Sequence, residues 1–173
     1  MTETERFAFV CPSGQGEWKG IDLSLLDPAN EDERRMLIEA EHPELRQAIE
    51  DDIREIHAGG RVMSPTLHIT MHEIVTNQLW ANDPPEVWQT AKRLTAAGYE
   101  RHEVLHMLSS VVASDVWRAL SGGEEHDEGH DLERVRTALA ALPGTWEIRR
   151  DEIPLERSRN RAERRAEERR RRQ

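Results

Sequence analysis

The stretch from residue 64 to residue 81 has the sequence SPTLHITMHEIVTNQLWA and predicts a buried helix with two histidines on one face. Ser64 is a favoured N-cap residue, and Pro65 fits the first position of a helix. Apolar residues recur through the stretch at helical spacing, which indicates that one side packs in a core. His68 and His72 are four positions apart and therefore lie one above the other on the same face.

A second stretch, from Glu100 to Leu120, repeats this pattern and is expected to form the longest core helix. It carries a histidine pair of the same spacing, His102 and His106. The two stretches are separated by one short helical segment. Because short connections make helices neighbours in a bundle, the two histidine pairs are expected to face each other.

Histidine pairs at this spacing are more frequent than chance predicts. Eight histidines in 173 residues should give about 0.4 such pairs, and the chain has a third, His126 with His130, in an acidic, glycine-flanked segment that we expect to be a solvated loop. Neutral imidazole is a common ligand of Zn, Fe, Cu and Ni. The predicted ligands of one transition-metal ion, Zn or Fe, are His68, His72, His102, His106 and Glu103.

The second pair also forms an HExxH motif, with Glu103 after His102. In zinc hydrolases of this pattern the glutamate activates a water molecule, so Glu103 is a candidate general base. The motif arises by chance in about one sequence in twenty of this composition, however. No strand-rich half is expected that could hold an extended peptide. The sequence therefore assigns no reaction and leaves open whether the protein is an enzyme.

Two further hypotheses remain open. A ferritin-like diiron centre would use Glu-x-x-His segments, and the chain has two, ending at His106 and at His42. His42 precedes Pro43, however, and is therefore expected at a helix boundary rather than within a helix. The other hypothesis is an interaction module that binds no metal and uses its Arg-rich C-terminal tail. No nucleotide, flavin or pyridoxal motif is present in the sequence.

The predicted fold is all-α, a compact bundle of about five to six helices. Residues 1–30 are expected to form an irregular arm with a short strand over Arg6–Val10, because Pro12, Gly14 and Gly16 interrupt the chain after this strand. Residues 31–148 form the helical domain, and residues 149–173 form a charged tail. Further helices are expected to start near Glu31, Pro43, Pro84 and Asp131.

Charge is distributed unevenly along the chain. The net charge is −10, but residues 149–173 hold 11 Arg and 6 acidic residues, a local charge of +5, which leaves −15 on the body. An acidic body argues against nucleic-acid binding, because phosphate contacts need clustered cations. The tail lacks an apolar stripe and is expected to be an exposed helix or disordered. It offers a surface for a second copy of the chain or for an acidic partner.

Cysteine usage and hydropathy limit the location of the protein. Cys11 is the only cysteine, which excludes an intrachain disulfide and a thiolate-based zinc site. The N-terminus lacks the pattern of a signal peptide. The sequence contains no uninterrupted apolar run long enough to span a membrane. A cytoplasmic protein without a membrane segment is therefore expected.

Several blocks of the sequence resemble one family of uncharacterised bacterial proteins. They are Glu41-His-Pro-Glu44, Ser64-Pro-Thr-Leu-His-Ile-Thr-Met-His72, Asp83-Pro-Pro85 and His102-Glu-Val-Leu-His-Met107 with Trp117. The family is a numbered "domain of unknown function" group, and the likeness covers about residues 41–120. Family members usually have Asn where this chain has Ser64. The resemblance implies a small helical bacterial protein and no particular activity.

Overall fold

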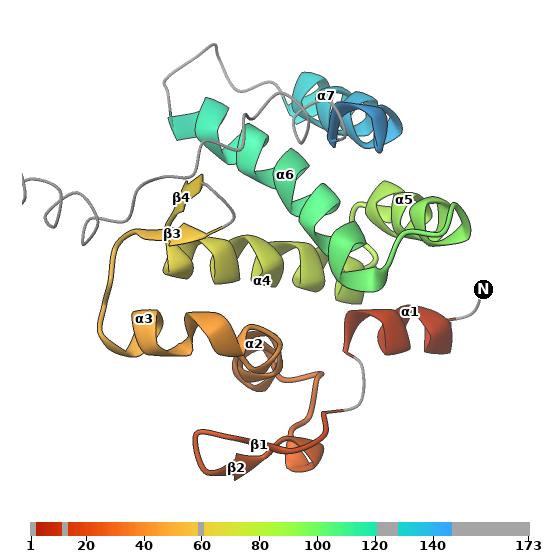
Figure 1. The fold of residues 1–173 in the computed structure, drawn as a ribbon. Helices are drawn as coiled ribbons and strands as arrows, with labels where there is room; N and C mark the ends of the chain where they lie inside the picture. The colour runs from red at the N-terminus through yellow and green to blue at the C-terminus, as the bar shows by residue number, and fades with distance from the viewer. Residues whose placement is uncertain (1–2, 12–13, 59–60, 121–127, 147–173) are drawn as a thin grey trace, which may run out of the picture.

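The computed structural model describes residues 3–11, 14–58, 61–120 and 128–146 and shows a bundle built mainly from helices (Figure 1). The α-helices in these ranges are α1 (Glu3–Val10), α2 (Glu31–Ala40), α3 (Arg46–Glu50), α4 (Pro65–Ala81), α5 (Pro85–Ala96), α6 (Arg101–Leu120) and α7 (Glu128–Ala140). Two 3-10 turns accompany them, η1 (Leu23–Leu25) and η2 (Pro43–Leu45). The predicted all-α bundle is confirmed.

Two small antiparallel hairpins lie beside the helices. In the first, β1 (Glu17–Trp18) pairs with β2 (Ile21–Asp22). In the second, β3 (Ile56–Ala58) pairs with β4 (Arg61–Met63). The second hairpin connects α3 to α4 along the chain.

Helix α4 begins and ends where its sequence predicts. The Ser64 side chain accepts a hydrogen bond of 3.2 Å from the backbone N–H of Leu67, and Pro65 occupies the first turn. The first N–H groups of a helix have no partner within the helix. Ser64 accepts a hydrogen bond from one of them, and Pro65 has no N–H to pair. Asn82 ends the helix in the left-handed conformation at φ 56°, a conformation that asparagine tolerates better than most residues.

Helices α4 and α6 pack together at the centre of the bundle (Figure 1). Helix α4 also contacts α1, α2, α3 and α5, and α6 also contacts α5 and α7. The main core is apolar and fully buried along this contact, with Val75, Leu79 and Val104 at 0 % exposure and Leu105 at 1 %. Smaller apolar clusters hold the first hairpin against α2, and α2 and η2 against the start of α4. The central helix pair therefore positions the other elements.

The strand predicted over Arg6–Val10 is wrong, because these residues belong to helix α1. The alternating aromatic residues suggested a strand, but each has a separate partner: the ring of Phe7 lies 4.3 Å from that of Trp80, and Phe9 lies 5.6 Å from Trp88. Arg6 is buried and donates to the backbone oxygens of Leu79 and Trp80 at the end of α4. These tertiary contacts outweigh the local strand propensity.

The helix predicted from Pro43 is shorter than its apolar spacing suggests. Helix α3 ends at Glu50, and the chain then enters the β3–β4 hairpin. The isoleucines at helical spacing therefore belong to different elements: Ile49 lies in α3, Ile53 is 41 % exposed in a loop, and Ile56 begins β3. Gly59 and Gly60 lie between the two strands in the sequence.

The acidic segment after α6 is described only in part, and the charged tail at 149–173 lies outside the described residues. His126 lies outside them as well, whereas His130 lies in α7. Among the described helices, none combines the length and the apolar character needed to cross a membrane.

Replacement of Leu79 by alanine tests the importance of the central contact. Leu79 is fully buried, so Leu79→Ala should lower the free energy of unfolding by about 2–5 kcal/mol. Leu67, on the same helix but 54 % exposed, is the matched control, and Leu67→Ala should cost about 0.5 kcal/mol or less. Urea unfolding measures both. Equal losses would show that α4 is not packed as described.

Candidate metal centre

His42 reaches the interior from the junction between α2 and η2. Its backbone N–H donates to the carbonyl of Glu39, and Pro43 then turns the chain into η2. The side chain is 1 % exposed, and its Nδ1–H donates to the backbone oxygen of Ile38 at 2.8 Å. A carbonyl oxygen can only accept, so this bond places the proton on Nδ1. Nε2 of His42 therefore carries a free lone pair.

Two helices supply the other histidines in pairs. His68 and His72 lie one turn apart on α4, with ring centroids 4.7 Å apart. His102 and His106 lie one turn apart on α6, at 4.5 Å. Because α4 packs against α6, the pairs meet, and His106 lies 4.8 Å from His72 and 5.1 Å from His68. The predicted convergence of the two helical pairs is present in the structure.

His72 lies at the centre of this five-histidine cluster (His42, His68, His72, His102 and His106). Its ring centroid lies 4.6–5.4 Å from those of the four others, and its side chain is 2 % exposed. The four outer rings form a circle around it, in which each ring contacts the next. The ring centroid of His42 lies 4.9 Å from those of both His68 and His102. Three separate segments of the chain thus bring five imidazoles to one place.

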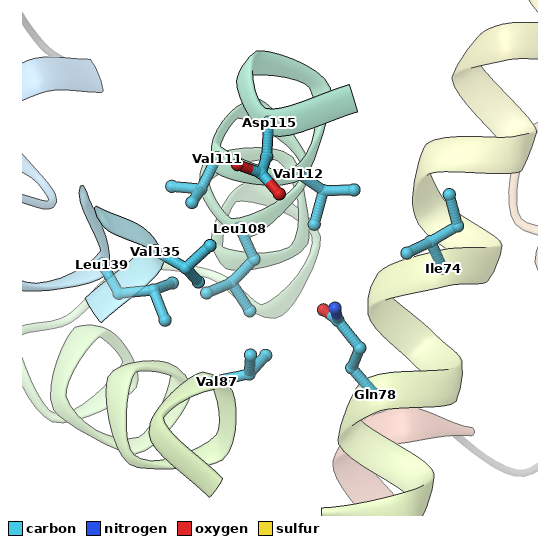
Figure 2. A pocket seen from close by; sticks show the side chains of 9 residues that line it. All are labelled: Ile74, Gln78, Val87, Leu108, Val111, Val112, Asp115, Val135 and Leu139. Carbon is cyan, nitrogen blue, oxygen red and sulfur yellow. The ribbon is translucent and has the colours of Figure 1, made fainter. Parts of the chain in front are cut away.

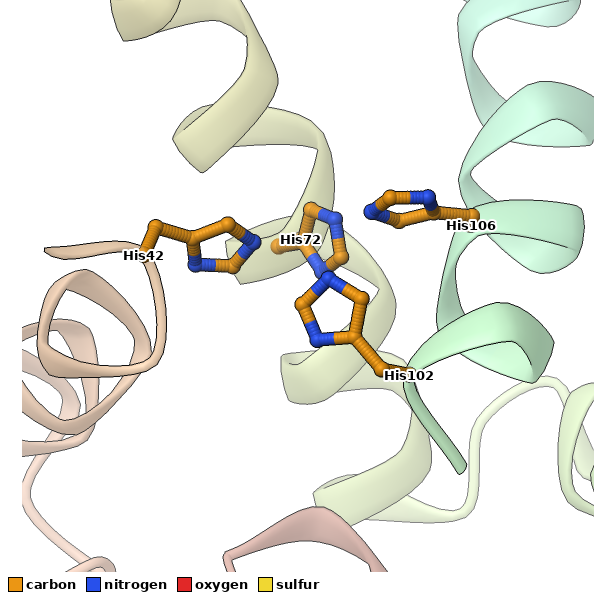
Figure 3. Close-up of side chains that lie close together, drawn as sticks. All are labelled: His42, His72, His102 and His106. Carbon is orange, nitrogen blue, oxygen red and sulfur yellow. The ribbon is translucent and has the colours of Figure 1, made fainter. Parts of the chain in front are cut away.

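Four of these rings have a spacing close to that of a metal site. One ring nitrogen from each of His42, His72, His102 and His106 lies within 4.8 Å of all the others, and Figure 3 shows the four rings gathered between α4, α6 and the end of α2. Tetrahedral zinc with bonds of about 2.0–2.1 Å requires nitrogens about 3.3 Å apart. Binding would therefore draw the rings inward by a short distance.

Three of the ring nitrogens have no hydrogen-bond partner in the part of the chain that the structure describes. They are Nε2 of His42, Nε2 of His72 and Nε2 of His106, and all three are buried. Leaving a buried polar atom unpaired costs about 1–3 kcal/mol, so three such atoms in one cluster are unfavourable without a ligand. A metal ion would coordinate these lone pairs directly. The arrangement also includes a feature common around metal-bound histidine, the anchoring of the second ring nitrogen of His42 by a carbonyl.

Burial favours the uncharged form of four of these histidines. The pKa of His72 is lowered to about 2, and the pKa values of His68 and His106 are lowered to about 4, first by desolvation and then by the neighbouring imidazoles. The pKa of His102 is also lowered, first by burial, although the carboxylates of Glu41 and Glu44 act in the opposite direction. Neutral imidazole is the form that binds metal. At neutral pH His68, His72 and His106 therefore have their lone pairs available.

The two remaining predicted ligands, His68 and Glu103, lie outside the group of four histidines with close ring nitrogens. His68 contacts three rings of the cluster, but the group of four with close ring nitrogens does not include it. Glu103 is half-buried on α6 and is also outside that group. Their roles as a ligand and as a general base stay predictions. Glu39, the glutamate of the Glu-x-x-His segment that ends at His42, forms ion pairs with Lys19 and Arg35. Glu73, a further carboxylate on α4, pairs with Arg35.

Arg101 links the segments that carry the histidines. It forms an ion pair of 3.0 Å with Glu41, the residue before His42, and it is itself the residue before His102. Its guanidinium also donates to the backbone oxygens of Phe9 and Val10 at the end of α1. Arg101 therefore holds the His42 segment against the start of α6.

The predicted ligand set of the transition-metal site does not include His42, which the sequence offered only for the diiron hypothesis. Its spacing from the other histidines carries no local pattern, and its position before proline argued against a site within a helix. The Glu41-His-Pro-Glu44 block was nevertheless one of the blocks that carry the family resemblance, and it marks the segment that enters the site.

Comparison with known proteins identifies the family. The chain belongs to the family described as a domain of unknown function, DUF1841, whose model matches residues 22–137. The predicted membership of an uncharacterised family is confirmed, and the match contains all five clustered histidines. No curated protein and no solved structure matches the chain.

Acid should destabilise the metal-free protein earlier than ordinary carboxylate titration would. The folded state holds the pKa values of His68, His72 and His106 below the unfolded value of about 6.5. The unfolded chain therefore binds more protons, and stability present above about pH 6.5 is lost as the pH falls toward 4. Urea unfolding of chelator-treated protein at pH 7 and pH 5.5 measures the loss.

The variant His72→Gln should reduce this pH dependence, because it removes the central ring. The matched control is His57→Gln, which changes an exposed histidine of β3 outside the cluster and should leave the dependence unchanged. Equal pH dependence in all three proteins would contradict neutral burial of the cluster.

Proposed function

We propose that this protein binds one divalent transition-metal ion through His42, His72, His102 and His106. The observation that supports it best is that four ring nitrogens lie close together, and that three of these histidines have a buried Nε2 without a hydrogen-bond partner among the described residues. Imidazole suits Zn, Cu, Fe and Ni, and Zn²⁺ or Fe²⁺ is the expected ion. His68, beside three of the rings, is the candidate for a fifth ligand.

The chemistry of the ligand set distinguishes two uses of the metal. Four imidazoles around Zn²⁺ would close its coordination and make the ion structural, whereas three imidazoles and a water would leave a position for reaction. Both histidines of the HExxH pair belong to the four-ring group, and this favours hydrolysis with Glu103 as general base as the second candidate function. A hydrolytic site would lose activity but keep its metal in Glu103→Gln.

Metal content tests the proposal directly. The purified protein should contain about one Zn or Fe per chain by elemental analysis, and His102→Ala should lose most of it. His57→Ala, outside the cluster, should retain the metal. Metal at 100 times its dissociation constant should also stabilise the fold by about 2.7 kcal/mol. A wild-type protein that neither contains nor takes up metal would leave only the interaction-module hypothesis.

Arg101 should affect affinity without being a ligand. Arg101→Gln removes the ion pair to Glu41 and frees the His42 segment, so metal affinity should fall about 10- to 100-fold, as for other outer-shell partners. Arg136→Gln, which removes a pair with Glu86 between α7 and α5, is the control and should bind metal normally. Competition with a chelator measures both affinities. Normal affinity in Arg101→Gln would show that the His42 segment needs no such support.

A further inference from the structure

A cavity lies on the opposite faces of the same two central helices. Its volume is about 190 Å³, it is lined by residues of α4, α5, α6 and α7, and none of these lining residues belongs to the histidine cluster. Ile74 follows His72 by two positions, and Leu108 follows His106 by two. Two positions correspond to about 200° around a helix, so each residue points away from the histidine before it.

The walls of the cavity are apolar, and two polar groups project into it. Val87, Leu108, Val112 and Val135 line it from three helices. Figure 2 shows the amide of Gln78 and the carboxylate of Asp115 directed toward the space that these side chains surround. A mostly apolar pocket with a small number of convergent polar groups is the usual form of a small-molecule site.

The polar groups specify the chemistry of the ligand. The amide oxygen of Gln78 is buried and has no hydrogen-bond partner among the described residues, so a ligand in the cavity that carries a donor would satisfy it. Asp115 adds a negative charge in the same wall, and the whole chain has a net charge of −10. A carboxylate ligand would be repelled here, whereas an ammonium group supplies three donors and no acceptor.

The volume sets the size of the apolar part. A cavity of about 150 Å³ with apolar walls holds one benzene molecule. The present cavity, at about 190 Å³, has room for one ring and a short arm. We propose that it binds a small organic cation, a primary ammonium group on an aromatic ring or a short alkyl chain. The site is separate from the proposed metal centre and does not depend on it.

Three probes of the same shape test the proposal: benzylamine, benzyl alcohol and benzoate. Titration calorimetry on the full chain should show benzylamine binding at least about tenfold more tightly than benzyl alcohol, because a charged hydrogen bond is worth more than a neutral one. Benzoate should not bind. In amide NMR spectra, benzylamine should shift signals of residues that line the cavity. Shifts elsewhere only, equal binding of benzoate, or no binding of benzylamine would overturn the proposal.

Variants locate the contacts. Gln78→Leu should weaken benzylamine and benzyl alcohol alike, whereas Asp115→Asn should remove most of the preference for the amine. Val112→Trp should fill the cavity and abolish binding of both. Glu55→Gln, an exposed acid that does not line the cavity, should change nothing. His102→Ala should bind benzylamine normally, so a protein without metal would still test this site. Unchanged binding in both Val112→Trp and Gln78→Leu would contradict the assignment.

Discussion

Helices α4 and α6 meet through Val75, Leu79, Val104 and Leu105, which are almost completely buried. This apolar contact is independent of the histidines, yet it fixes the distance between the two histidine pairs. The apolar contact between α4 and α6 occupies one face of each helix. On either side of this contact, other side chains of the two helices can point into the bundle. Here one side carries imidazoles and the other carries the walls of a cavity. Because the contact between α4 and α6 is stable, the two sides of this helix pair can hold groups that contribute little to folding.

The histidine cluster itself works against stability when no ion is bound. Five imidazoles gathered in one place cannot all be charged, and the buried Nε2 atoms of His42, His72 and His106 have no hydrogen-bond partner among the described residues. Ordinary packing would place leucine or methionine at such positions. The proposed coordination would account for the cluster, because the lone pairs that are unfavourable in the empty protein are the ones a metal ion would use.

Local patterns in the sequence predicted the helices and the histidine pairs, because both depend on spacing within one element. The helical periodicity around Ser64–Ala81 gives the burial of α4 and the shared face of His68 and His72 directly. The predicted ligand set of the transition-metal site left out His42. Its place in the cluster depends on how α2 packs on α4, and no local spacing in the sequence encodes that packing. The same limit explains α1, where Arg6 is held by carbonyls that lie more than 70 positions away in the chain.

The order of the histidines along the chain has a consequence for how the protein matures. His42, His72 and His106 come from three elements separated by long stretches of sequence, so their nitrogens meet only after α2, α4 and α6 have docked. A short peptide motif can capture its ion first and fold around it. In the proposed metal centre, by contrast, the fold would have to precede the ion. Loading would then be a final step, and a bound ion would tie three distant segments together, slowing any unfolding that must separate them.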